Sequence, residues 1–114
     1  MKVLRIEDMK GGWFCGNFEP TAFKTEAFEA SLKVHPKGEK WSHHFHRKVT
    51  EINLLVTGNM IMQDKELFAG DIFIIEPFEI ADPEFLTDCQ IVCIKVPGNY
   101  PGDKVEYEIN SPSR

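Results

Sequence analysis

Two histidines and one glutamate between residues 44 and 51 are the side chains best placed to do chemistry in this sequence. His44 and His46 are two positions apart, and residues two apart in a β-strand point to the same face of the sheet. Their backbones would lie about 7 Å apart, so both rings can reach one ion. Residues 47–50 can form a turn that returns Glu51 beside them on the neighbouring antiparallel strand. The pattern predicts a divalent metal site, and the alternative is a polar interior whose histidines are hydrogen-bonded and metal-free.

The elements that must position these side chains are strands. Short alternating or β-branched runs recur with turn residues between them, and no helical pattern of useful length appears, which is typical of an all-β sandwich or barrel. Residues 78–88 are expected to form a loop over one mouth of the barrel, and residues 1–27 to pack on the barrel or on a second subunit. The strands are expected at residues 28–35, 41–46, 51–57, 60–63, 66–68, 72–75 and 90–96.

Length and composition limit the class of protein. A chain of 114 residues with 42% hydrophobic and 27% charged residues is typical of one globular domain, here residues 1–114. A net charge of −5, with no cluster of basic residues, argues against nucleic acid as a partner. No apolar run reaches the length of a membrane-spanning helix, and the first residues lack the pattern of a secretory signal. Three cysteines are expected to be free thiols, and we therefore expect a cytoplasmic protein.

The segment around the histidines resembles the first motif of the cupin superfamily. That motif has a glycine, five residues, His-any-His, four residues, a glutamate, six residues and a glycine. The matching positions here are Gly38, His44, His46, Glu51 and Gly58. The resemblance covers roughly residues 28–96 and implies a cupin-type β-barrel (a double-stranded β-helix or jelly roll). It also implies a barrel core at about residues 28–97, a metal ion in its interior and a homodimer.

The second cupin motif is recognisable but altered. Six residues separate Gly70 from Pro77 where five are usual, and Glu79 stands where a glycine is usual. Asp82 stands where the resemblance implies the fourth metal ligand, a histidine. Asp82 could coordinate through oxygen, or it could open a turn before Pro83. Two histidines and one carboxylate suit Fe(II), and a fourth oxygen ligand favours Mn, but the sequence leaves Fe, Mn, Ni, Zn and Cu open.

The activity that the resemblance suggests is that of a metal-dependent small-molecule enzyme of the oxygenase, isomerase or lyase type. Asp82, Glu79 or a bound water would then be the general acid or base. A carbohydrate-related substrate is suggested by residues 95–97 and 102–104, which resemble the closing segments of small cupins associated with sugar metabolism. The alternative is a non-catalytic module that holds a sugar, an acid or a metal ion in the same cavity.

Five other polar residues have expected places. His43 should point to the opposite face from its neighbours and lie at the surface. His35, alone before a turn, should face solvent, and Lys95 should point outward from its apolar strand. Asn53 and Thr57 share the parity of Glu51, so they are expected to line the cavity.

Overall fold

The computed structural model describes residues 1–98 and 101–107. In this part of the chain the only helical element is a 3-10 turn, η1 (Ile6–Asp8), and no helix is long and apolar enough to cross a membrane. The strands are β1 (Trp13–Cys15), β2 (Glu29–His35), β3 (His43–His46), β4 (Thr50–Thr57), β5 (Asn59–Met62), β6 (Lys65–Phe68), β7 (Ile72–Ile75), β8 (Glu84–Phe85), β9 (Cys89–Val96) and β10 (Lys104–Tyr107).

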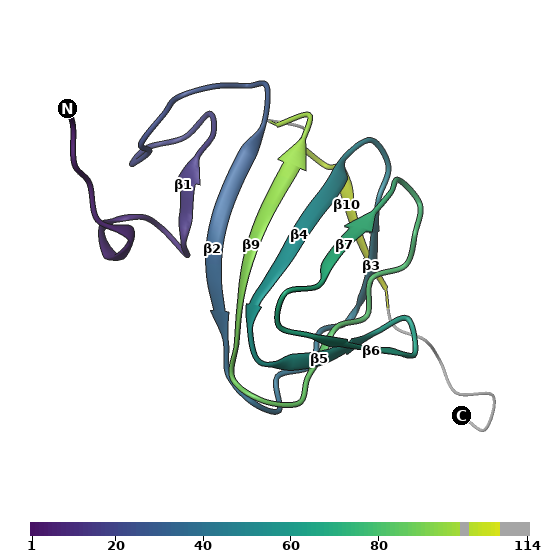
Figure 1. Cartoon of the computed structure of the whole chain (residues 1–114). Helices are drawn as coiled ribbons and strands as arrows, with labels where there is room; N and C mark the ends of the chain where they lie inside the picture. The colour runs from purple at the N-terminus through teal and green to yellow at the C-terminus, as the bar shows by residue number, and fades with distance from the viewer. Residues whose placement is uncertain (99–100, 108–114) are drawn as a thin grey trace.

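The largest sheet has five strands in the order β1-β2-β9-β4-β7 (Figure 1). Its neighbouring strands are antiparallel, and β9 lies between β2 and β4 although it comes late in the sequence. Because side chains alternate between faces, every second residue of β4 and β9 points to the inside of the molecule. Glu51 and Lys95 are direct cross-strand neighbours on that inner face.

Two smaller sheets, β10-β3 and β6-β5-β8, complete the fold. Two isolated β-bridges connect β3 and the residues before it to the region of β8. One joins His44 to Ala81, and the other joins Lys40 to Glu84. The long antiparallel pairings between segments distant in sequence are those of a jelly roll. The expectation of an all-β jelly roll is confirmed.

All seven expected strands are present, and their ends differ from the expected ones by no more than about two residues. The strands β1, β8 and β10 were not expected. β1 adds an edge strand beside β2, so residues 13–15 are part of the main sheet. β8 is a two-residue strand in the segment expected to be a loop. β10 pairs with β3 along its whole length, from Lys104 opposite His46 to Tyr107 opposite His43. The strand that carries the two histidines is therefore fixed by a segment that the motif does not include.

The two glycines at the ends of the first motif both have left-handed backbone conformations. The φ angles are 87° at Gly38 and 90° at Gly58. A Cβ at Gly58 would lie 2.4 Å from the carbonyl oxygen of Asp88, and no side chain tolerates that distance. The last glycine of the motif is thus required by the close approach of two chain segments at the end of β4.

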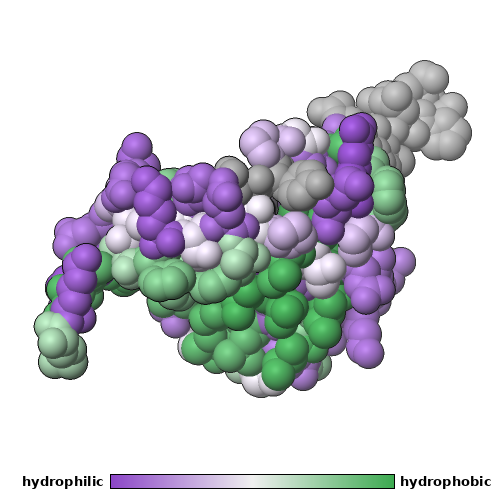
Figure 2. Space-filling model, turned by 90° about the horizontal axis from the view of Figure 1, so that it is seen from above, coloured by the Kyte–Doolittle hydropathy of each residue, from purple (hydrophilic) through white to green (hydrophobic). Residues whose placement is uncertain are grey.

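The face of the main sheet that points away from the interior is apolar and exposed. Ile52 and Leu54 on β4 lie opposite Ile74 and Ile72 on β7, and all four are at least 38% exposed. Figure 2 shows apolar surface gathered in one continuous area on one side of the molecule. Contiguous apolar surface of this kind is characteristic of protein interaction sites.

Candidate metal centre

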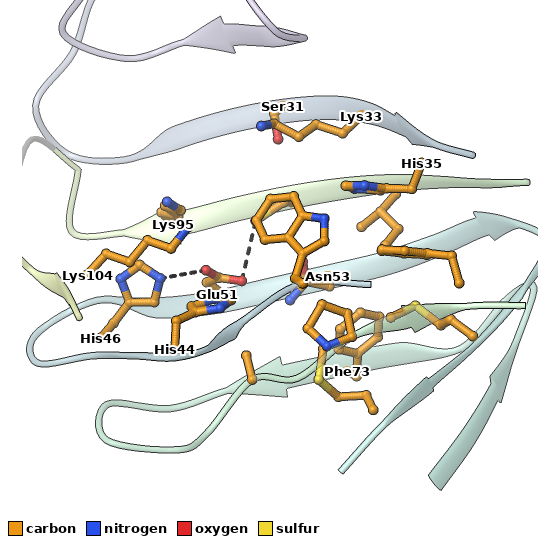
Figure 3. A pocket seen from close by; sticks show the side chains of 18 of the residues that line it. Ser31, Lys33, His35, His44, His46, Glu51, Asn53, Phe73, Lys95 and Lys104 are labelled. Atoms are coloured by element: carbon orange, nitrogen blue, oxygen red, sulfur yellow. Dashed lines mark hydrogen bonds and ion pairs between the residues drawn. The ribbon is translucent and has the colours of Figure 1, made fainter. Parts of the chain in front are cut away.

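The structure brings His44, His46 and Glu51 together inside the molecule, in the cavity shown in Figure 3. Both histidines are on β3 and are 5% and 3% exposed, and Glu51 is the second residue of β4. One candidate ligand atom from each side chain lies within 4.8 Å of the other two. The turn between β3 and β4 places the glutamate as the sequence predicts.

Asp103 fixes the orientation of the His46 ring. His46 Nδ1 lies 3.0 Å from Asp103 Oδ2, and the carboxylate also accepts hydrogen bonds from the backbone N–H groups of Arg47, Lys48 and Val49. Burial alone would raise the pKa of Asp103, but the N–H of Lys48 and the His46 ring outweigh it and lower the pKa. An ionised Asp103 therefore accepts a hydrogen bond from the Nδ1–H group and fixes the ring with Nε2 directed at Glu51, where a metal ion could bind it.

His44 is held in the same tautomer by a weaker contact. Its Nδ1 lies 3.4 Å from the carbonyl oxygen of Ser42, which can only accept a hydrogen bond. Burial and the nearby Lys104 ammonium lower the pKa of His44. A neutral ring with the proton on Nδ1 presents Nε2 as a ligand atom, as metal-binding histidines require.

Glu51 is ionised despite being largely buried. Burial would raise the pKa of its carboxyl, but the His46 ring and the Lys95 ammonium hold the pKa below its usual value. Cys93 Sγ lies 3.9 Å from Glu51 Oε1, and burial together with the Glu51 charge raises the pKa of the thiol to about 12. Cys93 is therefore a thiol beside a carboxylate ligand and not a thiolate ligand itself.

The donor set fits a divalent metal ion. His46 Nε2 is buried and has no hydrogen-bond partner of acceptable geometry in the described part of the chain, although Glu51 Oε2 lies 2.8 Å away. Ligand bonds of about 2.0–2.2 Å would allow these two atoms to hold one ion together. A metal ion would satisfy both atoms at once, and two imidazoles with one carboxylate are a common set for Fe(II), Mn or Zn.

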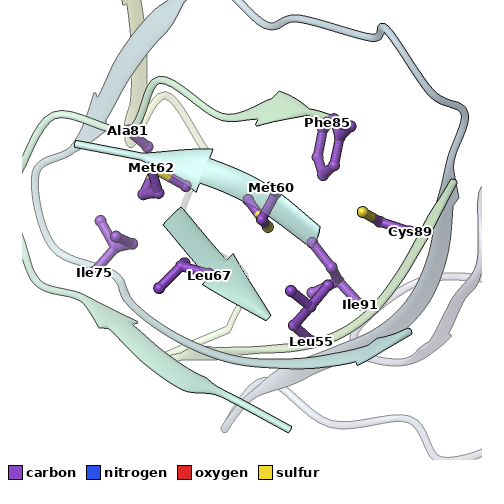
Figure 4. Close-up of a cluster of buried hydrophobic side chains, with 9 residues drawn as sticks. All are labelled: Leu55, Met60, Met62, Leu67, Ile75, Ala81, Phe85, Cys89 and Ile91. Atoms are coloured by element: carbon purple, nitrogen blue, oxygen red, sulfur yellow. The ribbon is translucent and has the colours of Figure 1, made fainter. Parts of the chain in front are cut away.

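The centre opens into a cavity of about 260 Å³. One end of the cavity is apolar and consists of core side chains that include Met60, Phe85 and Ile91 (Figure 4). The other end is polar and includes the three candidate ligands and the side chains of Lys95 and Lys104, which Figure 3 shows beside them. A small molecule in this cavity would contact the metal ligands directly.

The structure does not bring Asp82 or Glu79 to this centre. Asp82 Oδ1 accepts a hydrogen bond from the backbone N–H of Gln63, and Glu79 Oε2 accepts one from the N–H of Glu76, so each carboxylate holds a turn. Ala81, the residue before Asp82, pairs with His44 and lines the cavity. Asp82 has the opposite parity and points away, so among residues 1–98 and 101–107 the candidate cluster consists of His44, His46 and Glu51.

The other expected placements divide into correct and incorrect ones. The expectation that Asn53 lines the cavity is confirmed, and His43 lies on the opposite face, 3.8 Å from Asp82. Thr57 is exposed because a register shift between Leu55 and Thr57 changes the parity of β4.

His35 and Lys95 were expected to face solvent, and both expectations are wrong. His35 is buried, stacks on Phe85 at 4.2 Å and lies 3.3 Å from Glu39. Lys95 lines the cavity beside Glu51, because it has the inward parity of Cys93.

Comparisons with known proteins identify the fold. No family model matches the sequence, and no curated protein matches it. The solved structure of an uncharacterized conserved protein with a double-stranded beta-helix domain from Klebsiella pneumoniae matches with a TM-score of 0.70 and 15% identity, over 95% of this chain and 93% of that one. A cupin-2 domain containing protein from Shewanella frigidimarina matches with a TM-score of 0.53 and 18% identity, over 63% and 72% of the two chains.

An enzyme is among the structures that match. The DMSP lyase DddQ from Ruegeria pomeroyi has a TM-score of 0.64 and 15% identity, and the match covers 82% of this chain and 49% of DddQ. This chain therefore matches about half the length of that enzyme. At these identities the likenesses establish a shared fold, the double-stranded β-helix of cupins, and leave the activity to be argued from the site.

Proposed function

We propose that this chain, which has the cupin fold, is a metal-dependent enzyme acting on a small molecule, with His44, His46 and Glu51 as the ligands of one divalent ion. The observation that carries the proposal is the buried His46 Nε2, which is directed at Glu51 and is held in the ligating tautomer by Asp103. A histidine whose other ring N–H donates to a carboxylate, which fixes the orientation of the ring, is the usual arrangement in metal sites.

The number of protein ligands supports catalysis over storage. Three ligands leave coordination positions that a substrate or water can occupy, whereas structural sites are commonly closed by four protein ligands. When bound, the ion would supply Lewis acidity or a site for dioxygen chemistry. The cavity beside the ligands has the size of a small metabolite and not of a polymer.

The chain's own residues have distinct roles in this proposal. Asp103 keeps the proton on His46 Nδ1 and so holds the ring in one orientation. Apart from the ligands, the titratable side chains that line the cavity are Lys33, His35, Cys93, Lys95 and Lys104. Proton transfer would fall to one of the lysines or to a water bound near Glu51, since Asp82 and Glu79 lie outside the cavity.

The reaction is of the oxygenase, isomerase or lyase type. The fold alone does not choose among them, but one matching protein is described as a lyase. An isomerase or a lyase needs an acid or base near the ion, and the lysines at the polar end of the cavity could supply it. A carbohydrate-related substrate fits the polar lining of that end.

A non-catalytic binding module is the second candidate. It is favoured by the absence of a carboxylate, other than Glu51, among the described residues that line the cavity. Such a module would hold its ligand without turnover. The two candidates differ in whether the bound metal exchanges its solvent ligands and whether any substrate is converted.

The proposal includes a cytoplasmic location. The three cysteines, Cys15, Cys89 and Cys93, are free. Thiols persist in a reducing compartment, and Cys89 is fully buried, where it packs as a small apolar side chain.

Elemental analysis tests the proposal. Wild-type protein purified without added metal should contain about one equivalent of a transition metal, and His46→Ala should lose it while its strands persist in circular dichroism. His43→Ala is the matched control, since this adjacent histidine lies on the other face. Equal trace metal in all three proteins would refute the metal site, and full metal without turnover of any small molecule would favour the binding module.

A further inference from the structure

Three lysines gather around the cavity of a chain whose net charge is −5. Lys33 comes from β2, Lys95 from β9 and Lys104 from the start of β10. Burial, followed by the charges of Lys95 and Lys104, lowers the pKa of Lys33. The polar end of the cavity therefore brings three ammonium groups together beside one carboxylate, Glu51, and these ammonium groups are candidate partners for an anion.

Two of these ammonium groups have no carboxylate partner within ion-pairing distance among the described residues. Lys104 pairs with Glu106 at 3.1 Å, but Lys33 and Lys95 make no such pair. Instead, their Nζ atoms lie 5.2 and 4.9 Å from the centre of the Trp13 ring. The ring holds both lysines in place by cation–π contact and leaves their N–H groups available.

Two polar side chains in the same cavity are buried without partners. Within residues 1–98 and 101–107, Ser31 Oγ and Asn53 Nδ2 make no hydrogen bond, and these residues are 0% and 5% exposed. They lie on either side of Cys93 in one cross-strand row of the inner face. A buried donor without a partner costs free energy, so this row is suited to a ligand with oxygen acceptors.

The two rows have a defined order along the sheet. Glu51 and Lys95 form one cross-strand pair, and the row of Ser31, Cys93 and Asn53 is two residues further along the strands. Lys33 is one inward position beyond Ser31 on β2. One lysine therefore lies on each side of the row of hydroxyl and amide donors, and Lys95 lies between Glu29 and the proposed ligand Glu51 in its own row.

We infer that the substrate is a small hydroxylated carboxylic acid, whose carboxylate binds Lys33 and Lys95 and whose hydroxyl or carbonyl oxygens bind Ser31 and Asn53. This inference names the substrate class of the proposed enzyme. It rests on the proposed function only in calling the acid a substrate, because binding of the acid does not require catalysis. The cavity of about 260 Å³ accommodates an acid of three to six carbons. The apolar end opposite the lysines excludes a second charged group there.

Calorimetric titration with two matched pairs of probes tests this inference. D-gluconate is compared with D-glucitol, and D-glycerate with glycerol, because each pair differs only in the carboxylate. Each acid should bind at least about tenfold more tightly than its neutral partner, and its affinity should fall as KCl is raised. The titrations are made on metal-loaded and on chelator-treated protein, since gluconate also binds free metal ions.

The double variant Lys33→Met with Lys95→Met should reduce the preference for the acid to about twofold or less. Methionine keeps the length and apolar contacts of the side chain while removing the charge. Lys65→Met, on an exposed strand outside the cavity, is the matched control and should leave the preference unchanged. Thermal melting verifies that both variants fold.

Two results would overturn the inference: acids and neutral partners that bind alike, or a preference that the double variant retains. Metal content measured on the same samples separates this inference from the proposed function. Full metal without preference for acids removes only the substrate class. Preference for acids without any metal removes the metal enzyme and leaves an acid-binding module.

Discussion

Asp103→Asn changes one atom behind His46 and should weaken metal binding through the tautomer of the ring. Asp103 Oδ1 accepts hydrogen bonds from the N–H groups of Arg47 and Lys48, and Oδ2 accepts from His46 Nδ1 and the N–H of Val49. Asparagine has only one oxygen. If that oxygen accepts the hydrogen bonds from the N–H groups of Arg47 and Lys48, the new NH₂ group faces two donors. These are the Nδ1–H group of His46 and the backbone N–H of Val49.

His46 can accept from this NH₂ only by moving its own proton from Nδ1 to Nε2, the atom that must bind the metal. Loss of the carboxylate that accepts a hydrogen bond from a metal-binding histidine typically lowers metal affinity 10- to 100-fold, or by about 1.4–2.7 kcal/mol. The buried N–H of Val49 remains unpaired, which costs about 1–3 kcal/mol of unfolding free energy. The variant should therefore fold, with lower stability and weaker metal binding.

The sign of the pH dependence follows from the lowered pKa of Asp103. The ionised Asp103 carboxylate contributes to the unfolding free energy above its unfolded-state pKa of about 3.9. This contribution is lost as the pH falls through the lower pKa of Asp103 in the folded state. The variant lacks this ionisable group, so its stability should fall less steeply than that of wild type below about pH 4. Urea unfolding of the metal-free proteins at several pH values measures this.

Competition with a chelator measures the metal affinity, and ¹⁵N spectra of the imidazole rings report which nitrogen of His46 carries the proton. Asp71→Asn is the matched control, because Asp71 Oδ2 accepts a hydrogen bond from Phe68 N at 2.8 Å in an exposed turn. It should change stability slightly and metal affinity not at all. A variant Asp103→Asn that binds metal within twofold of wild type, with the proton still on Nδ1, would refute the reasoning.

Three further predictions concern the core, the thiol and the outer face. Leu55→Ala, at a fully buried site, should lower the unfolding free energy by about 2–5 kcal/mol in urea titration. At pH 8, iodoacetamide should label Cys93 far more slowly in the folded than in the unfolded chain, because a pKa of about 12 against 9.0 lowers the thiolate fraction about 1000-fold. We also propose that the apolar outer face pairs with a second copy of the chain. In sedimentation the wild type should be a dimer, and the double variant Ile52→Lys with Ile74→Lys should be a monomer with unchanged metal content. A monomeric wild type would contradict this proposal.

Local periodicity was sufficient to predict where His44, His46 and Glu51 meet. Two residues on one strand and a third after a short turn are positioned by rules that act within ten residues. The same rules placed Asn53 correctly on the inner face. They could not place Thr57, because a register shift in β4 reverses its side.

Long-range pairings limit what the sequence can predict about the rest of the site. Asp103 is 57 positions from His46, and the β3-β10 pairing places it there. The alternation of charged and apolar residues from Lys104 to Tyr107 is a strand signal that indicates β10, but it does not name the partner strand. Lys95 was expected outside because lysine is seldom buried, and only the tertiary structure shows the cavity that receives it.

The most direct test of the metal centre is an anomalous difference map from crystals of the metal-loaded protein. One strong peak is expected within about 2.0–2.3 Å of Nε2 of His44, Nε2 of His46 and a carboxylate oxygen of Glu51. The remaining coordination positions should be filled by solvent or a small molecule. A peak elsewhere, no peak, or a closed site completed by a fourth protein side chain would contradict the account.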